Sequence, residues 1–113
     1  MTRGSVVLTP FPFTDLQGSK VRPAIVVSPP DRMGDDVILA FISSVKPARP
    51  HPTDLLLSPS DPDFAATGLK ADSILKCDKL ATVQRRILLG ELGTLSATLM
   101  AKVDQRLRLA LGL

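Results

Sequence analysis

The sequence predicts a mainly β fold, in which a small barrel of short strands is packed against one C-terminal α-helix. All ten prolines lie at or before Pro62, and short apolar or β-branched runs lie between them. This pattern is typical of strands separated by turns. The chain after Pro62 has no proline and ends in apolar residues at helical spacing. With 113 residues and 12.1 kDa, we expect a single domain over residues 1–113.

The expected strands follow the short apolar runs. Residues 5–8 begin the first strand, and the prolines that follow make its continuation an edge or a strand exit, because proline cannot donate to a sheet ladder. Residues 24–27 are wholly apolar, which is typical of a strand buried on both faces. Gly90 indicates a bulge within the apolar run 87–92. Residues 15–20 are expected to form a loop, and the remaining strands are expected at 37–43, 53–57, 73–75 and 81–84.

The C-terminal segment is expected to be one amphipathic helix. Ser96 is a good N-cap residue, because its hydroxyl can accept a hydrogen bond from a free amide of the first turn. Asp104 and Arg108 have the spacing of an ion pair on the polar side, and Gly112 can end the helix. The apolar stripe follows three- and four-residue spacing: Leu99, Met100, Val103, Leu107 and Leu111. This stripe packs on the barrel, contributes to a dimer interface, or does both.

Composition excludes several classes of protein. The longest apolar run, 37–42, is far shorter than the roughly 20 residues that a membrane helix needs. The first residues contain no apolar segment typical of a signal peptide, and Cys77 is the only cysteine, so a reducing, cytoplasmic setting is expected. The chain has one His, one Cys and one Glu, so a zinc site is not expected to form. Its ten Asp leave a carboxylate-held magnesium open, but we expect no metal or other cofactor. A net charge of +3 permits an anionic partner without requiring one.

Two segments carry the most specific chemistry. Residues 18–28 read GSKVRPAIVVS, a polar loop that ends in cations and enters a buried strand. Pro23 keeps Arg22 out of the helical region, so the guanidinium projects from the start of a rigid strand, where it can bind phosphate through two parallel bonds. The strand 37–43 then ends in Ser43 and Ser44, whose hydroxyls can bond a phosphate oxygen. Each segment also has a simpler interpretation. Arg22 can be an ordinary surface arginine, and the two serines can simply begin a loop.

Five stretches, in order along nearly the whole chain, resemble the MazF/PemK family of toxins from toxin–antitoxin pairs. They are 10–15 (PFPFTD), 20–28 (KVRPAIVVS), 42–44 (ISS), 68–80 (GLKADSILKCDKL) and 93–96 (GTLS). The resemblance implies an SH3-like barrel of the CcdB/MazF type with a C-terminal α-helix. It also implies a homodimer, metal-independent endoribonuclease cleavage of single-stranded RNA, and a cognate antitoxin protein that covers the RNA groove.

The same resemblance implies roles for individual residues. Arg22 matches the catalytic arginine, and Ser43 best matches the catalytic threonine at the end of the central strand, with Ser44 a near alternative. We expect the substrate to be contacted by a further set of residues around this site: Phe11, Phe13, Ser19, Lys20, Ser44, His51, Asp78 and Lys79.

Other readings of these residues stay open. His51 is the only residue whose ordinary pKa suits acid–base chemistry near neutrality, yet it lies in a proline-rich loop where a solvated histidine is the simpler interpretation. Asp61 and Asp63 are better read as turn residues than as a metal pair. The segment 70–86 holds five cations and two anions, which is either an RNA-binding stretch or a solvated strand face. Phe11 and Phe13 either stack on a base or join the core.

Two further functions compete with RNA cleavage. One is a protein-binding toxin of the same fold that poisons a DNA-handling enzyme. The other is a catalytically inactive module that only binds its antitoxin. The fold alone cannot choose between them, because function resides in the site. Arg22 beside a strand-end hydroxyl favours RNA cleavage.

Overall fold

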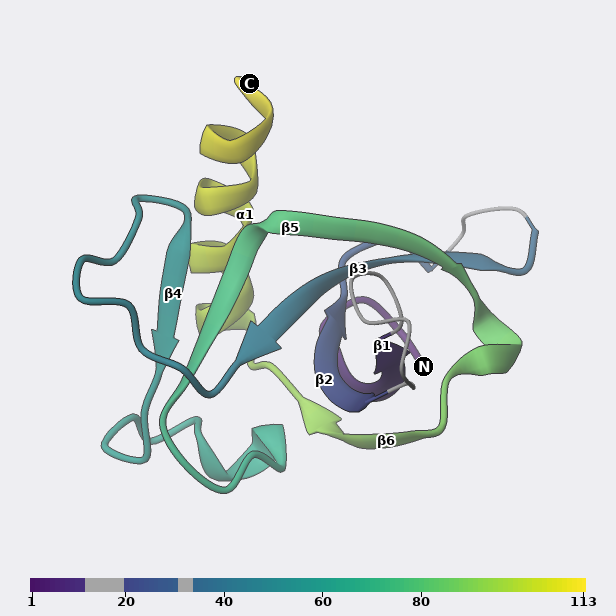
Figure 1. The fold of residues 1–113 in the computed structure, drawn as a ribbon, viewed down its shortest axis with the longest axis horizontal. Coiled ribbons are helices and arrows are strands. Elements are labelled where there is room, and N and C mark those ends of the chain that lie inside the picture. The colour runs from purple at the N-terminus through teal and green to yellow at the C-terminus, as the bar shows by residue number, and fades with distance from the viewer. Residues whose placement is uncertain (12–19, 31–33) are drawn as a thin grey trace.

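The protein is a curled six-stranded antiparallel sheet with one helix packed against it (Figure 1). The computed structural model describes residues 1–11, 20–30 and 34–113. The strands follow the order β4-β5-β3-β2-β1-β6. Their bounds are β1 Ser5–Phe11, β2 Lys20–Val26, β3 Asp36–Ser43, β4 Asp54–Leu57, β5 Ser73–Gln84 and β6 Gly90–Thr94. Two short 3-10 helices, η1 Ala65–Thr67 and η2 Arg85–Ile87, precede the helix α1 Ala97–Leu111. Within the described ranges, no helix is long and apolar enough to cross a bilayer.

The sheet is buried on both of its faces, as the wholly apolar run in β2 predicts. Ile25 packs into a cluster that α1 covers, whereas its neighbours Ala24 and Val26 pack into a second cluster on the opposite face. The first cluster contains the helix residues Leu99 and Val103. The second is closed by side chains from the far half of β5 and from the segment after η2, where the sheet curls back on itself (Figure 1). Burial of aliphatic surface on both faces is the main source of stability of the fold.

Strand β1 behaves as its prolines require. Its first residues pair with both β2 and β6, whereas the residues after Leu8 pair with β2 alone. Pro10 therefore lies where β1 has become an edge strand, the place in a sheet where proline is tolerated. Lys20 pairs with Phe11 and begins β2, so the expectation that the loop extends through residue 20 was wrong there. Residues 15–19 lie outside the described part of the chain.

The expected short strands 73–75 and 81–84 are the two halves of one strand, β5. Its pairing with β3 jumps from Lys76, opposite Phe41, to Leu80, opposite Ala40. The residues between them, 77–79, have no partner on β3, and the amide of Cys77 donates instead to Thr53 O at 3.2 Å. This long bulge lets β5 turn sharply between its two halves (Figure 1).

The bulge expected at Gly90 lies elsewhere in β6. Val6 pairs with Gly93 and Val7 pairs with Glu91, so Leu92 is the additional residue. The reason that Gly93 is a glycine is instead a close backbone approach. A Cβ at Gly93 would lie 2.1 Å from Ala66 O, and a Cβ at Gly68 would lie 2.2 Å from Leu92 O. Two glycines therefore allow the η1 segment to pack directly on the backbone of β6.

The helix agrees with the sequence pattern in most respects. Ser96 caps it, with its Oγ accepting from the Leu99 amide at 3.2 Å, and Gly112 ends it at a φ of 72°. Along the expected stripe, Leu99 and Val103 are buried, but Leu111 is exposed. The expected pairing of Asp104 with Arg108 was wrong, because Asp104 pairs with Arg3 across the fold at 2.6 Å. A tertiary partner has replaced the local one.

The approach between η1 and β6 predicts a large effect of a small substitution. Gly93→Ala is expected to lower the free energy of unfolding by about 2 kcal/mol or more, because the new Cβ meets backbone that cannot rotate away. Gly90→Ala in the same strand is the control, since its Cβ would meet nothing within 4 Å. Urea unfolding of both variants measures the difference. Equal stability of the two would contradict the packing of η1 on β6.

The bulge also predicts the behaviour of Cys77, which is fully buried. Burial raises the pKa of its thiol to about 11 from an ordinary 9.0, and only the thiolate is reactive. The folded protein is therefore expected to react with a thiol reagent far more slowly than the urea-unfolded chain. The thiol pKa is higher in the folded protein than in the unfolded chain, so burial of the neutral thiol contributes to the free energy of unfolding. This contribution is complete below pH about 9 and is lost as the pH rises toward 11. Fast labelling under native conditions would show instead that the bulge opens readily.

Candidate active site

A surface pocket of about 210 Å³ lies where β2, the end of β3 and the bulge of β5 meet. It combines three cationic side chains with two hydroxyls on an apolar floor. Its lining residues are Arg22, Phe41, Ile42, Ser43, Ser44, Val45, Lys76 and Lys79. The two segments that the sequence singles out, 18–28 and 37–44, are thus brought together at one site.

Arg22 projects from β2, where it pairs in register with Thr9 of β1. The strand fixes its backbone, and the following Pro23 keeps that backbone extended. The side chain is exposed. It makes no hydrogen bond or ion pair with any residue that the structure describes. The guanidinium is always charged and carries five donors, so it presents to the pocket a cation that no described residue engages.

The two serines differ in how they are held. Ser43 is the last residue of β3 and is half-buried, and its Oγ accepts a hydrogen bond from the Val45 amide at 3.1 Å. That bond orients the hydroxyl and leaves its proton available to an acceptor in the pocket. Ser44 is exposed, and its side chain makes no hydrogen bond within the described ranges. Ser43 is therefore the better-ordered donor of the two.

The β5 bulge brings two lysines to the same pocket. In a regular strand, residues 76 and 79 would point to opposite faces, because side chains alternate. The residues without a partner on β3 break this alternation, so that both Lys76 and Lys79 line the pocket. Lys76 was not among the predicted site residues. A strand pattern gives no sign of a bulge, and the only signal in the sequence was the excess of cations between residues 70 and 86.

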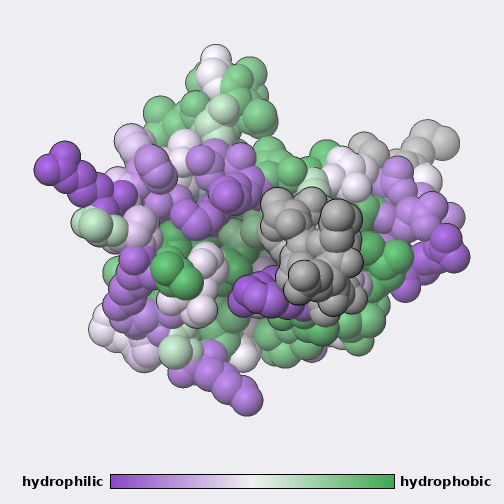
Figure 2. Space-filling view, viewed as in Figure 1, coloured by the Kyte–Doolittle hydropathy of each residue, from purple (hydrophilic) through white to green (hydrophobic). Residues whose placement is uncertain are grey.

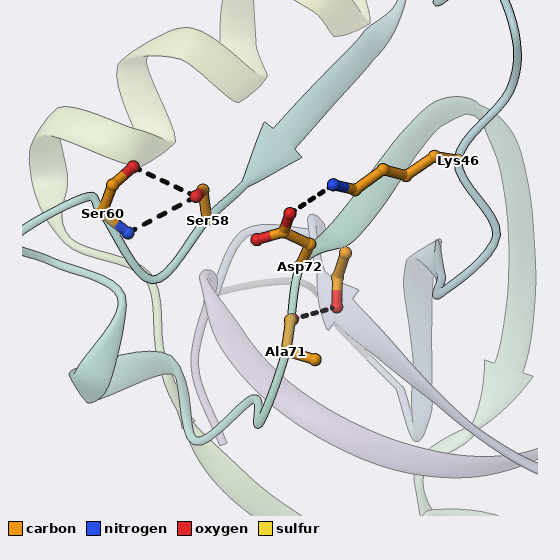
Figure 3. Close-up of polar contacts among 6 residues, drawn as sticks. Lys46, Ser58, Ser60, Ala71 and Asp72 are labelled. Carbon is orange, nitrogen blue, oxygen red and sulfur yellow. Dashed lines mark hydrogen bonds and ion pairs between the residues drawn. The ribbon is translucent and has the colours of Figure 1, made fainter.

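The loop that follows β3 is anchored by an ion pair. Lys46, directly after Val45, reaches across to Asp72, which lies just before β5 (Figure 3). The hydrogen bond from Lys46 holds the pKa of the Asp72 carboxyl below its usual value. The segment carrying Ser43 and Ser44 is thereby tied at its far end to the strand that carries the two lysines.

Other predicted contact residues lie outside the pocket lining. Lys20 is exposed at the start of β2, and Asp78 is exposed on the bulge, but neither lines the pocket. His51 is exposed in the loop before β4, and its backbone amide donates to Asp54 Oδ2 at 3.0 Å. Phe13 and Ser19 lie outside the described residues, and Phe11 is described only as the last residue of β1, paired with Lys20.

Asp61 and Asp63 form a turn, as expected. The Asp63 amide donates to Asp61 Oδ1 at 2.8 Å, and Asp63 Oδ2 accepts from the helix-capping hydroxyl of Ser96 at 2.7 Å. Both carboxylates thus have structural partners. Among the residues that the structure describes, no group of three or more His, Cys, Asp and Glu side chains lies together in a way that could hold a metal ion.

The chain is similar to known toxins in sequence and in structure. Residues 2–111 match the family described as PemK-like, MazF-like toxin of type II toxin–antitoxin system. A mycobacterial endoribonuclease solved in complex with its cognate antitoxin is 27% identical, with a TM-score of 0.75 over 100% of this chain and 96% of that one. Another mycobacterial endoribonuclease structure is 26% identical, with a TM-score of 0.74 over 100% and 92%.

A more distant structure shares the fold. The MazE–MazF complex of Deinococcus radiodurans is 22% identical, with a TM-score of 0.75 over 100% of this chain and 97% of that one. No curated protein matches the chain. The family match covers β2, β3, the bulge of β5 and all of α1. This chain is a member of the PemK-like, MazF-like family of toxins of type II toxin–antitoxin systems.

Proposed function

We propose that this toxin is an endoribonuclease that cleaves single-stranded RNA at the Arg22 pocket without a metal ion. The observation that carries the proposal is that one cationic pocket is lined both by Arg22, which has no hydrogen bond or ion pair to a described residue, and by the oriented hydroxyl of Ser43. The endoribonuclease activity of the two mycobacterial relatives supports it. The whole described chain acts as one domain in this proposal.

The reaction needs no external nucleophile. A ribose 2′-oxygen attacks the adjacent phosphorus as its proton passes to solvent water, and the bond from phosphorus to the 5′-oxygen breaks while that oxygen takes a proton from water. The products are a 2′,3′-cyclic phosphate and a 5′-hydroxyl. The protein must align the 2′-oxygen and stabilise the added negative charge on the phosphorane. Donors already aimed at developing charge give the largest gain in such a reaction.

Arg22 suits the charge-stabilising role. Arginine stays protonated in proteins, so we assign it electrostatic stabilisation of the phosphorane and a hydrogen bond to the leaving oxygen, rather than the role of a base; solvent water supplies the proton that the leaving oxygen takes up. Its planar fork matches two phosphate oxygens at once. The Ser43 hydroxyl donates a hydrogen bond to a non-bridging oxygen, while the hydrogen bond from the Val45 amide fixes its orientation. Lys79 adds positive charge at the rim of the pocket.

The partners follow from the family and from the surface. We propose that a cognate antitoxin covers the pocket, as toxins of two similar structures were solved with their antitoxins. We also propose a homodimer acting in a reducing cytoplasm. The exposed apolar end of α1 supports the dimer, because Leu109, Leu111 and Leu113 are 62%, 59% and 86% exposed. Figure 2 shows this end of the helix as a hydrophobic region at the top of the molecule, apart from the hydrophilic groups beside β4.

Arg22→Ala is expected to lower kcat by about 100-fold or more, on the order of 3 kcal/mol of transition-state stabilisation. The assay incubates the purified protein with a long unstructured RNA in excess EDTA and maps the fragment ends. The exposed position of Arg22 predicts that the variant unfolds at the same urea concentration as the wild type. Arg22→Lys keeps the charge without the fork and is expected to recover only part of the rate.

The outcomes separate the competing functions. Discrete cuts by the wild type that vanish in Arg22→Ala would support the proposal and reveal the cleavage motif. Toxicity that survives Arg22→Ala would favour a protein that poisons a DNA-handling enzyme. Intact RNA after incubation with folded wild-type protein, together with binding of the antitoxin, would favour an inactive binding module.

The serine pair gives a second prediction. Ser43→Ala is expected to slow cleavage about tenfold or more, because an oriented donor to the phosphate is lost. Ser44→Ala is the matched control, since Ser44 is exposed and makes no side-chain hydrogen bond to a described residue; its expected change is within about twofold. Single-turnover rates on one RNA measure both. The reverse order of effects would assign the catalytic hydroxyl to Ser44.

A further inference from the structure

Lys76 faces a buried carboxylate on the neighbouring strand. Asp54, the first residue of β4, pairs directly with Lys76 of β5. Lys76 Nζ lies 3.9 Å from Asp54 Oδ1, and the two side chains are 21% and 1% exposed. This distance allows strong electrostatic attraction and is too long for a hydrogen bond. Lys76 is therefore drawn toward Asp54 without giving up its donors.

The Asp54 carboxylate is held firmly in its place. Its Oδ2 accepts from the His51 amide at 3.0 Å, and its own amide donates to His51 O at 2.9 Å. Arg106 Nε fixes the Asp54 backbone by donating to its carbonyl oxygen at 2.8 Å. Asp54 Oδ1 is buried and accepts no hydrogen bond from any residue that the structure describes. A buried charge so poorly satisfied is costly, which points to a role beyond packing.

We propose that Lys76 binds a phosphate of the RNA as the third cation of the pocket, and that Asp54 is a positioning residue that holds its ammonium at the pocket wall. This inference rests on the proposed function. Lys76 lines the pocket beside Ser43, and its ammonium carries three donors. None of these is used in a hydrogen bond to a residue within the described ranges. They remain available to phosphate oxygens.

If Asp54 positions Lys76, its substitution should affect cleavage and RNA binding differently, which a purely structural role does not predict. Asp54→Asn keeps an acceptor for the His51 amide but removes the charge that orients Lys76. The net positive charge of the protein rises by one, so RNA is expected to bind at least as tightly as to the wild type. Cleavage at saturating RNA is expected to fall about tenfold, since the ammonium is no longer aimed before the charge develops. We therefore expect a lower kcat with a KM that is unchanged or lower.

The phosphate contact is tested by binding without cleavage. A short random-sequence 2′-O-methyl RNA, which lacks the attacking hydroxyl, is titrated between about 0.05 and 0.2 M salt. Lys76→Met is expected to weaken binding about tenfold and to reduce the slope of log K against log salt by about 0.7, the value for one phosphate contact on a single strand. Lys76→Arg is expected to retain the slope. Lys102→Met is the control, because Lys102 is exposed on α1 and lies outside the pocket.

Urea unfolding first establishes that the Lys76, Lys102 and Asp54 variants are folded. The binding and cleavage results then either support the inference or overturn it. A slope that falls in Lys76→Met but not in Lys102→Met, with the predicted response of Asp54→Asn, supports the inference. Equal slopes for these two lysine variants, with cleavage by the wild type intact, would overturn it and leave the proposed function standing. A higher KM in Asp54→Asn would contradict the positioning role of Asp54 and indicate that this residue only supports the structure. A wild type that neither binds this RNA nor cleaves unmodified RNA would overturn both.

Discussion

The interruption of pairing between β3 and β5 is the constraint on which the site depends. Residues 77–79 have no partner on β3, and this single irregularity has two effects. It turns the direction of β5, so that one half pairs with β4 while the other pairs with the first part of β3 as the sheet curls around the second apolar cluster. It also cancels the alternation of side chains, so that Lys76 and Lys79 share one pocket while Cys77 turns into the core. The burial of Cys77 and its backbone bond to Thr53 hold the bulge in place.

Charged groups divide into those that hold the fold together and those that the fold leaves available. Arg3 joins the first turn of the chain to α1 through Asp104, Lys46 joins the loop after β3 to Asp72, and Arg106 bonds the start of β4. The pocket cations make no hydrogen bond with described residues, and within the described part of the chain only Lys76 among them has a carboxylate within 4.0 Å. Like charges gathered in this way repel one another, and an anion entering the pocket relieves the repulsion. The described charges of the pocket therefore favour the entry of an anion.

Local sequence predicted the elements well and their irregularities poorly. The apolar run in β2, the strand ending at Ser43 and the capped helix depend on side-chain periodicity, which is visible in the sequence. The bulge in β5, the additional Leu92 and the Arg3–Asp104 pair depend on partners far away in the chain, and no local pattern encodes them. The same division applies to the site. The resemblance to a toxin family pointed to Arg22 and Ser43, whereas Lys76 and Asp54 became candidates only when the register placed them opposite each other.

The pairing of β1 with β6 links the beginning of the chain to its end. Ser5 lies opposite Thr94, and Arg3 reaches Asp104 in α1, so β1 gains its second neighbour only after residues 90–94 have been synthesised. Contacts of such sequence separation form late, because the loop that they close is long. Arg22, Ser43 and Lys76 all leave the ribosome before the strand and helix that complete their scaffold. The order of synthesis therefore delays completion of the fold around the pocket until β6 and α1 have both been made.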